Sequence, residues 1–235
     1  MTEWSDLERS GKLLDNLIVN LLDKVQGLSL TNHKDFVLQI MEKFDIIVRP
    51  LGDKTKQCMY MPCMIKAVNM NVIARDIGNK DCKKTSWFCL QFDFLPPSYF
   101  NHILVSFVKQ NKLWIGRDNR LGIYRNVGVF SLNSSGSKVL LICLLENSIA
   151  MQVWQWKCGE HDCYSDIKNK LLDLVNSIKL RYRININYEK HFKCSDGFCQ
   201  ENDARVKVDV VIENVEYYCS NTRACIQAQK STAVG

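Results

Sequence analysis

Residues 121–156 read LGIYRNVGVFSLNSSGSKVLLICLLENSIAMQVWQW, and this stretch decides the fold class. It holds four short apolar runs, at residues 121–125, 128–132, 138–145 and 148–156. Asparagine, serine and glycine separate the runs, as is typical of the turns that join antiparallel strands. We therefore predict an antiparallel β-meander.

Helical periodicity lies on both sides of this meander. Pro97 suits the first position of a helix, and the apolar residues after it fall on one helical face as far as Val108. Residues 164–178 carry apolar side chains at helical spacing and polar ones between them. Basic residues follow this second helix and complement its C-terminal dipole: Lys179, Arg181 and Arg183.

Further strand signals lie outside the meander. Residues 86–94 form a β-rich run that Pro96 ends, and residues 184–188 alternate between apolar and polar side chains. Residues 206–212 and 215–218 are weaker strand candidates. The second half of the chain is therefore expected to contain a sheet packed with helices.

The N-terminal part is predicted to be mainly helical. Residues 4–25 repeat leucine, isoleucine and valine at close to the helical period, which predicts one amphipathic helix. The next helix is expected to bury an apolar stripe made of Phe36, Val37, Ile40, Met41 and Phe44. Strand candidates at residues 45–49 and 57–65 follow, and this order is typical of a winged-helix-like unit.

These elements predict an α+β fold: a helical, winged-helix-like N-terminal subdomain followed by an antiparallel β-meander packed with helices. The polar connector at residues 79–84 marks the expected boundary. We expect subdomains at residues 1–80 and 85–225, and a flexible tail at residues 226–235.

Composition narrows the functional classes. Lysine and arginine total 31 against 25 acidic residues, so the net charge of +6 is mild and spread along the chain. Acidic residues in the predicted recognition helix and just after it, Asp35, Glu42 and Asp45, disfavour nucleic acid as a partner. Apolar runs are far shorter than the roughly 20 residues of a membrane-spanning helix, and residues 1–9 do not resemble a secretory signal. We expect a cytoplasmic protein with no membrane partner.

Motifs for catalysis are missing from the sequence. It contains no phosphate-binding loop, no His-Glu-x-x-His pair and no Gly-x-Ser-x-Gly turn. A cysteine nucleophile paired in space with His102, His161 or His191 stays open, because such partners meet only in the fold. We expect no enzyme activity and no cofactor.

The 11 cysteines raise the alternative of a zinc-binding domain. Cys158-x-x-His161-x-Cys163 precedes the second predicted helix, and His191-x-x-Cys194 follows it. Thiolates and imidazoles are the ligands that zinc selects. The weak candidate ligand set is Cys194, Cys199, Cys219 and Cys225. The spacing is loose for a structural zinc site, so reduced thiols used for packing, as expected of Cys89 and Cys143, are the preferred interpretation.

Aromatic side chains on the meander are the candidate interaction residues. Trp154 and Trp156 lie two apart on one strand and should share a face. Aromatic residues spaced two apart on a strand more often pack against a covering helix, or contact another protein, than stack on nucleic-acid bases. The residues expected to form an exposed apolar contact surface are Trp114, Tyr124, Phe130, Trp154 and Trp156.

Four segments, in this order, resemble the COR domain that follows the Roc GTPase in Roco proteins. They are residues 35–45 (DFVLQIMEKFD), 60–64 (YMPCM), 92–105 (FDFLPPSYFNHILV) and 121–130 (LGIYRNVGVF). The resemblance covers most of residues 13–220, and the cysteine-rich C-terminal end is similar to that of the invertebrate multidomain members.

The resemblance implies a truncated COR-A-like first subdomain and a COR-B-like second one. It also implies a role in dimerisation and in regulatory coupling to a Roc-type GTPase or another signalling partner, in cis or in trans. The sequence contains no Roc domain, so GTP binding is not implied for this chain, and the resemblance transfers no catalytic residue.

Overall fold

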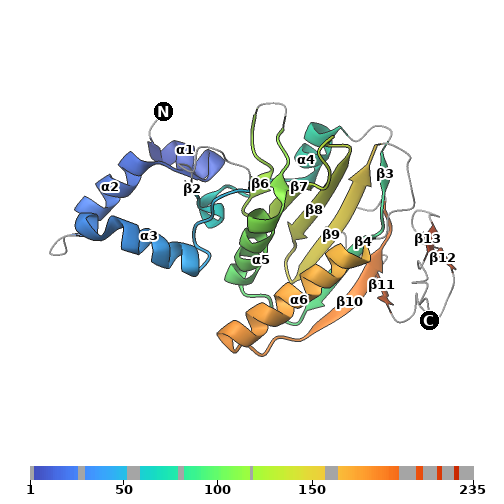
Figure 1. Cartoon of the computed structure of the whole chain (residues 1–235). Helices are drawn as coiled ribbons and strands as arrows, with labels where there is room; N and C mark the ends of the chain where they lie inside the picture. Colours follow the sequence, from blue (N-terminus) through green and yellow to red (C-terminus); the bar gives the residue numbers. More distant parts are fainter. Residues whose placement is uncertain are drawn as a thin grey trace.

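The computed structural model describes residues 3–25, 30–51, 59–78, 82–116, 119–156, 164–195, 205–208, 216–218 and 225–227. Within these residues an α+β fold is observed, in which every pairing between named strands is antiparallel. A helical region lies to one side of a large sheet (Figure 1). The predicted fold class is therefore confirmed.

A nine-stranded sheet forms the centre of the protein, with the order β11-β10-β4-β9-β8-β7-β5; β3 also pairs with β9, and β6 with β7. Its strands are β3 (Lys83–Lys84), β4 (Trp87–Phe92), β5 (Lys112–Leu113), β6 (Ile123–Tyr124), β7 (Val127–Ser131), β8 (Lys138–Leu144), β9 (Ser148–Gln155), β10 (Tyr188–Lys193) and β11 (Arg205–Lys207). The four predicted runs of the meander correspond to β6, β7, β8 and β9, which confirms that prediction.

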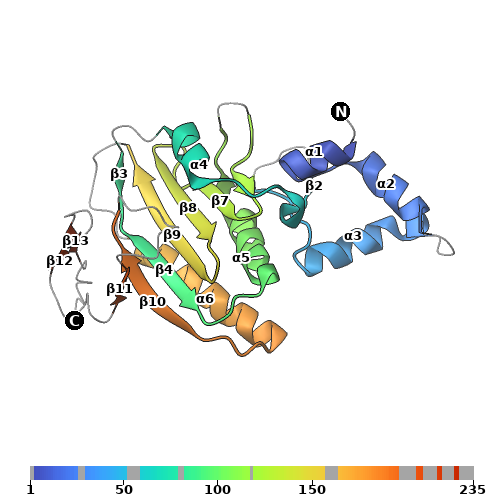
Figure 2. The same ribbon diagram turned by 180° about the vertical axis from the view of Figure 1, so that it is seen from behind.

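Helices cover both faces of this sheet, and their cover explains why its central strands are apolar along their length. Helices α5 (Pro97–Gln110) and α6 (Ser165–Tyr182) pack on one face, over a core that includes Phe100, Leu104 and Phe130. Helix α4 (Met70–Ile77) packs on the other face (Figures 1 and 2). Pro97 is the first residue of α5, as predicted. We call the sheet and these three helices the sheet body.

The expected subdomain boundary at residues 79–84 assigns α4 to the helical N-terminal half, but in the structure α4 packs against the sheet. Met70 and Ile73 of α4 are buried against Val129, Leu141 and other residues of the sheet. Asn69 caps the helix by accepting a hydrogen bond from the Asn71 amide at 2.8 Å. By its packing, α4 belongs to the sheet body and not to the helical half. The sequence did not show this, because the polar connector follows α4 instead of preceding it.

The N-terminal arm, residues 3–25, 30–51 and 59–65, has its own small core. Its elements are α1 (Glu3–Ser10), β1 (Lys12–Leu13), α2 (Asp15–Asp23), the 3-10 helix η1 (Leu30–His33), α3 (Lys34–Lys43), β2 (Met59–Tyr60) and the 3-10 helix η2 (Pro62–Met64). Seven buried side chains form this core: Leu7, Leu13, Leu17, Ile18, Leu38, Ile47 and Met59.

The single helix predicted over residues 4–25 is wrong. Gly11 adopts a φ of 72°, in the left-handed region that glycine tolerates best, and it separates α1 from α2. A Cβ atom at Gly11 would overlap the side chain of Ile65. The hydrophobic period continues through the break because both helices face the same small core, so periodicity alone could not reveal it.

The strand candidates of the arm are much shorter than predicted. Leu13 pairs with Met59, and Lys12 pairs with Tyr60. Val48 forms an isolated antiparallel bridge with Tyr60, whose two hydrogen bonds each measure 2.8 Å. Tyr60 therefore lies between β1 and Val48.

The C-terminal strands also shift relative to the prediction. The strand expected at residues 184–188 begins only at Tyr188, since β10 spans Tyr188–Lys193. Strand β11 covers part of the candidate at residues 206–212, and β12 (Glu216–Tyr218) pairs with β13 (Cys225–Gln227). The predicted tail lies outside the described residues except for Ile226 and Gln227. In the described part of the chain, no helix combines the length and apolar character needed to cross a membrane.

Candidate interaction surface

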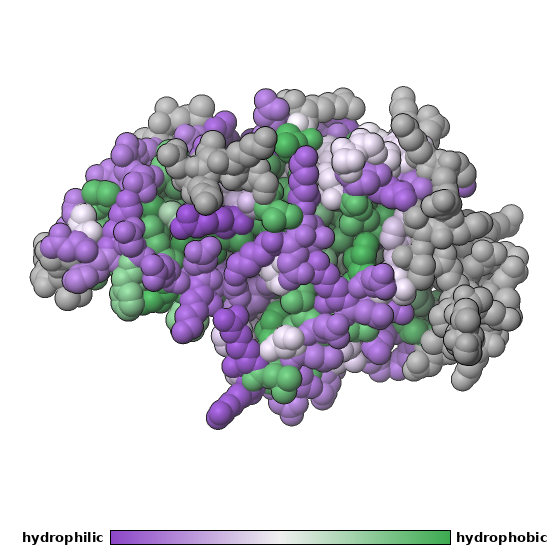
Figure 3. All heavy atoms as spheres, in the orientation of Figure 1, coloured by the Kyte–Doolittle hydropathy of each residue, from purple (hydrophilic) through white to green (hydrophobic). Residues whose placement is uncertain are grey.

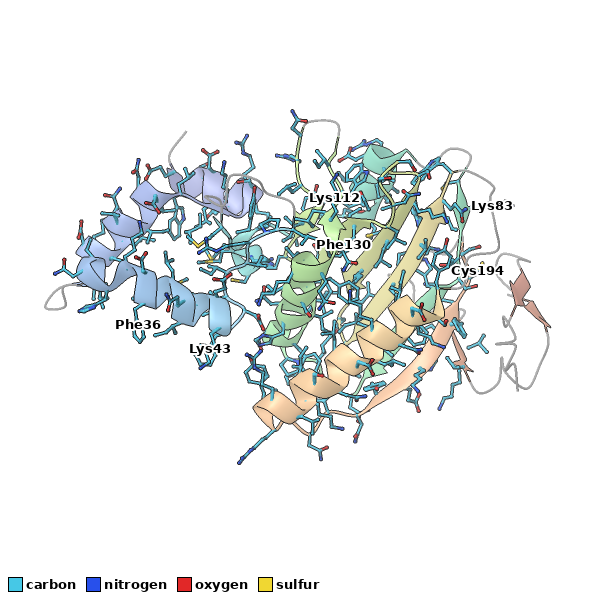
Figure 4. The ribbon with its side chains drawn as sticks, in the orientation of Figure 1. Phe36, Lys43, Lys83, Lys112, Phe130 and Cys194 are labelled. Atoms are coloured by element: carbon cyan, nitrogen blue, oxygen red, sulfur yellow. The ribbon has the colours of Figure 1, made fainter. Side chains whose placement is uncertain are left out.

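Helix α3 presents an apolar stripe to solvent. Phe36, Ile40 and Phe44 lie four residues apart, and their exposed fractions are 63%, 39% and 51%. The opposite face of α3 carries Leu38, which is buried in the core of the arm. Figure 4 shows Phe36 and Lys43 projecting from the same side of α3, away from α2. The predicted burial of the five-residue stripe is wrong for these three side chains, because the arm core is small and takes the Leu38 side of α3. Val37 is half-buried, and Met41 packs, partly buried, against the arm core.

The C-terminal end of α6 lies beside the end of α3. The Arg181 side chain donates a hydrogen bond to the Lys43 carbonyl oxygen at 3.0 Å. Its neighbour in the chain, Leu180, is 79% exposed, the highest value among the large hydrophobic residues of the described chain. Figure 3 shows apolar spheres over α3 and near the end of α6, with hydrophilic ones between them. We call Phe36, Ile40, Phe44 and Leu180 the α3–α6 surface.

Asp45 holds this junction together. It follows α3 with a φ of 56°, a left-handed conformation that aspartate tolerates better than most residues. The Ile46 amide bonds to the Met41 carbonyl at 2.9 Å and the Asp45 amide to the Glu42 carbonyl at 3.2 Å, which is the Schellman pattern of a helix C-terminus. This turn directs the Asp45 side chain away from the arm and toward α5 and α6.

Three basic side chains of the sheet body surround the Asp45 carboxylate. Lys109 donates to it at 2.8 Å, Arg181 at 3.3 Å, and the His102 Nδ1 atom lies 3.2 Å from it. Asn101 adds a hydrogen bond to the Asp45 carbonyl oxygen at 2.7 Å. Asp45, which is only 8% exposed, therefore ties the arm to α5 and α6, together with the hydrogen bond from Arg181 to the Lys43 carbonyl oxygen.

The electrostatics of Asp45 favour its charged form. Burial acts to raise the pKa of the carboxyl group, but the hydrogen bonds from His102 and Lys109 and the positive charge of Lys109 outweigh it. The pKa of Asp45 therefore lies below its ordinary value of 3.8. Asp45 is ionised at neutral pH, and its contacts are charge-assisted.

A cleft of about 1000 Å³ continues from this junction toward the sheet. Phe44 and Ile46 of the arm line one part of it, and the α5 N-terminus and the β8–β9 turn line others. His102 and Cys63 both border the cleft, so the open question of a cysteine nucleophile applies here. Among the described contacts, no hydrogen bond joins that thiol to the imidazole, and burial raises the pKa of the Cys63 thiol. A raised pKa disfavours the thiolate that nucleophilic catalysis needs.

The predicted aromatic residues do not form one exposed surface. Phe130 is fully buried between the sheet and α5, with its ring centroid 5.7 Å from that of Phe107 (Figure 4). Trp154 is buried on the α4 face. The expectation of exposure is wrong for these two residues, because helices cover both faces of the meander. Trp114, Tyr124 and Trp156 are partly buried against the α4-side core.

The predicted zinc ligands fall mostly outside the described residues. This applies to Cys158, His161, Cys163, Cys199 and Cys219. Cys194 is buried, and Cys225 lies in β13. His191 is also buried; burial, with a smaller opposing effect of Glu189, lowers the pKa of its imidazole. No group of three potential metal ligands occurs in the part of the chain that is described. The zinc site stays a prediction.

Sequence reasoning missed the α3–α6 surface although it had the relevant signal. Both its apolar stripe and the basic end of α6 were recognised, the first as core and the second as compensation of the helix dipole. The sequence did not show which element, if any, packs against each helix face. An apolar stripe is buried only if another element covers it. No protein-family model matches the chain, and no curated protein matches its sequence.

Proposed function

We propose that the chain is a non-enzymatic protein-interaction module that binds its partner through the α3–α6 surface. The observation that carries this proposal is the exposure of Phe36 and Ile40 along one side of helix α3 and of Phe44 at the C-cap of that helix. Burying a side chain of this size contributes roughly 1.5–3 kcal/mol. A row of exposed apolar side chains such as the one along α3 is typical of protein contact sites, and Leu180 stands apart from this row at the end of α6.

The order of elements in the arm supports the resemblance to a COR domain. A helix, a strand and two helices are followed by Val48 and β2, and Tyr60 of β2 lies between β1 and Val48. This is the order expected of a winged-helix unit. In DNA-binding members of that class the recognition helix presents basic and polar side chains to the major groove. Here the third helix, α3, presents apolar side chains, which favours a protein partner over nucleic acid.

The partners that follow from this proposal are those implied by the resemblance: a Roc-type GTPase or another signalling protein, or a second copy of the chain. The arm offers the surface, and the Asp45 contacts would transmit its position to the sheet body. We place this role in the cytoplasm.

Two measurements test the proposal. Quantitative affinity capture from cytosol compares the wild-type chain with a Phe36→Ser variant and with Phe94→Ser as a control. Phe94 is 66% exposed and lies outside the α3–α6 surface. Light scattering over a concentration series reports self-association of the same proteins.

We expect partners or self-association that Phe36→Ser reduces and Phe94→Ser leaves unchanged. A strictly monomeric protein whose captured proteins do not depend on Phe36 would contradict the proposal. Turnover of a substrate in the cleft would contradict its non-enzymatic part.

A further inference from the structure

Helix α3 and its C-cap residue expose two adjacent rows of side chains, each with a four-residue spacing. The apolar row is Phe36, Ile40 and Phe44, and the polar row beside it is Asp35, Gln39 and Lys43. All six residues are exposed, whereas the other residues of α3 are buried or half-buried. Figure 4 shows Phe36 and Lys43, one from each row, on the same side of the helix. These two rows therefore form the outer face of α3.

The polar row carries opposite charges at its two ends. Asp35 lies in the first turn of α3, Lys43 lies in the last turn, and Gln39 lies midway between them. Among the described contacts, none of these three side chains forms a hydrogen bond or an ion pair. The other two charged residues of α3 are paired within the chain, Lys34 with Asp15 at 2.6 Å and Glu42 with Arg49 at 3.6 Å. In the described structure, one carboxylate and one ammonium group of the outer face therefore stay available.

Both rows are complementary to themselves when the helix is reversed. The apolar row has an aromatic ring at each end, and the polar row has an acid at one end and a base at the other. A two-fold axis through the middle of both rows would place Phe36 of one copy beside Phe44 of the other. The same axis would place Asp35 of each copy beside Lys43 of the other. The two Gln39 side chains would meet near the axis, where each amide can donate a hydrogen bond to the other. Helices pack ridge into groove along rows of this spacing.

The same pattern disfavours other occupants of this face. Asp35 would repel an acidic partner helix, and Lys43 would repel a basic one. A helix that binds an anionic membrane carries basic side chains along the polar flanks of its apolar face, whereas the charges of this polar row cancel. A parallel pair of α3 helices would set like charges against each other at both ends. A foreign helix would need the same pattern in reverse, which α3 of a second copy already supplies.

We propose that two copies of the chain associate through their α3 helices, which pack antiparallel about a two-fold axis, with Asp35 of each copy paired to Lys43 of the other. This inference rests on the proposed function and names the partner as a second copy. The apolar rows supply the contact area, and the paired charges set the direction of packing. The rows extend over about 12 Å, so the contact is small and the association is weak.

Charge reversal tests this geometry with the full chain. Sedimentation velocity is measured on the wild type and the variants up to about 500 µM, because a small interface dimerises only at high concentration. The variants are Asp35→Lys, Lys43→Asp, the double variant with both changes, and Phe36→Ser. Exposed residues outside α3 provide the matched controls Asp173→Lys, Lys190→Asp and Phe94→Ser. Thermal melts confirm that each variant is folded.

The wild-type chain should dimerise, and Phe36→Ser should weaken the dimer about tenfold, which corresponds to about 1.4 kcal/mol. Each single reversal turns two attractive pairs into repulsive ones and should also weaken the dimer about tenfold. The double variant should recover most of the wild-type affinity. An equimolar mixture of Asp35→Lys and Lys43→Asp should associate more strongly than either variant alone, because their charges complement each other. Added salt should weaken the wild-type dimer, and the control variants should dimerise like the wild type.

The other outcomes separate this inference from the proposed function. A chain that stays monomeric over this range, or a dimer insensitive to Phe36→Ser or to the charge reversals, would overturn the α3 pair. A dimer that the single reversals weaken but the mixture does not restore, or that salt strengthens, would overturn the antiparallel arrangement. In each of these cases, capture of another protein that depends on Phe36 would keep the α3–α6 surface as a docking site. A monomeric chain whose captured proteins do not depend on Phe36 would overturn both proposals.

Discussion

The arm and the sheet body use apolar residues in opposite ways. In the sheet body, Phe130, Leu140 and Ile142 have no exposed surface, and helices cover both faces of the sheet. In the arm, a core of seven buried side chains supports three helices, and α3 buries only one of its two apolar faces. The arm is held to the sheet body by the contacts of Asp45 and by Val48 and Ile65, which extend into the main core.

This difference separates residues that stabilise the fold from residues that are free to bind. An apolar side chain in the sheet body has no surface left for a partner. An apolar side chain on the outer face of α3 adds less to stability, and its exposed part, between 39% and 63% for Phe36, Ile40 and Phe44, stays available for association. The four predictions below test this contrast, in order of decreasing expected effect on stability.

The largest effect is expected for Phe130→Ala. Phe130 is fully buried, packs against Phe107, and lies over Gly128, where a Cβ atom would overlap the Phe130 ring. Truncating a buried phenylalanine costs about 3–5 kcal/mol. Urea unfolding should show this loss of unfolding free energy. A loss below about 1 kcal/mol would mean that Phe130 is less tightly packed than its burial indicates.

Within the arm, Leu38→Ala and Ile40→Ala compare the two faces of α3. Leu38 is 6% exposed and Ile40 is 39% exposed. Leu38→Ala should cost about 2–4 kcal/mol of local stability, and Ile40→Ala less than about 1 kcal/mol. Amide hydrogen exchange should show faster opening of α1 to α3 in Leu38→Ala, with β8 and β9 unchanged. Equal effects of both variants would remove the distinction between the faces.

Asp45→Asn tests the connection between the two regions. Asparagine keeps the left-handed backbone accessible but removes the charge that His102, Lys109 and Arg181 share. Hydrogen bonds to charged groups contribute about 1.5–3 kcal/mol, so a loss of about 1–3 kcal/mol is expected at neutral pH. Asp35→Asn, at an exposed position of α3, is the control and should change stability by less than about 0.5 kcal/mol.

The pH dependence of this variant has a defined sign. The pKa of Asp45 in the folded protein lies below its ordinary value of 3.8. The contribution of the ionised carboxylate to the free energy of unfolding is therefore fully present when the pH is above this ordinary value. The contribution disappears as pH falls through the lower pKa of the folded protein. The stability difference between wild type and Asp45→Asn should therefore shrink under acid, as measured by urea unfolding at a series of pH values. A difference that stays constant would show that Asp45 acts through backbone geometry alone.

The smallest effect on stability is expected for Phe36→Ser. The side chain is 63% exposed, so unfolding free energy should change by less than about 0.5 kcal/mol. Association through the α3–α6 surface should weaken at the same time. A large loss of stability would place Phe36 in the core and remove the contrast between the arm and the sheet body.

Much of the sheet body could be predicted from sequence because its signals are local. The turns around Asn126, Asn133 and Asn147 separate strands that pair with their neighbours in the chain, and Pro97 begins a helix with one continuous apolar face. Strand type and order then follow from residues close together in sequence.

The arm and the candidate site could be predicted less well because they depend on distant contacts. The break at Gly11 is set by its conformation and by the approach of Ile65. Burial of Trp154 depends on α4, which was expected to belong to the other subdomain. Asp45 was used in the sequence argument only as an acidic residue that disfavours nucleic acid as a partner, and only the fold shows that its own contacts come from α5 and α6.

The sheet order has a consequence for synthesis of the chain. Strand β4 lies between β9 and β10, but β10 follows it by about a hundred residues, after the whole meander and α6. While the ribosome is still making that stretch, one side of the apolar strand β4 has no hydrogen-bonding neighbour, and unpaired edges of this kind recruit other nascent chains. Chaperone demand should therefore end when residues 188–193 emerge and close that side.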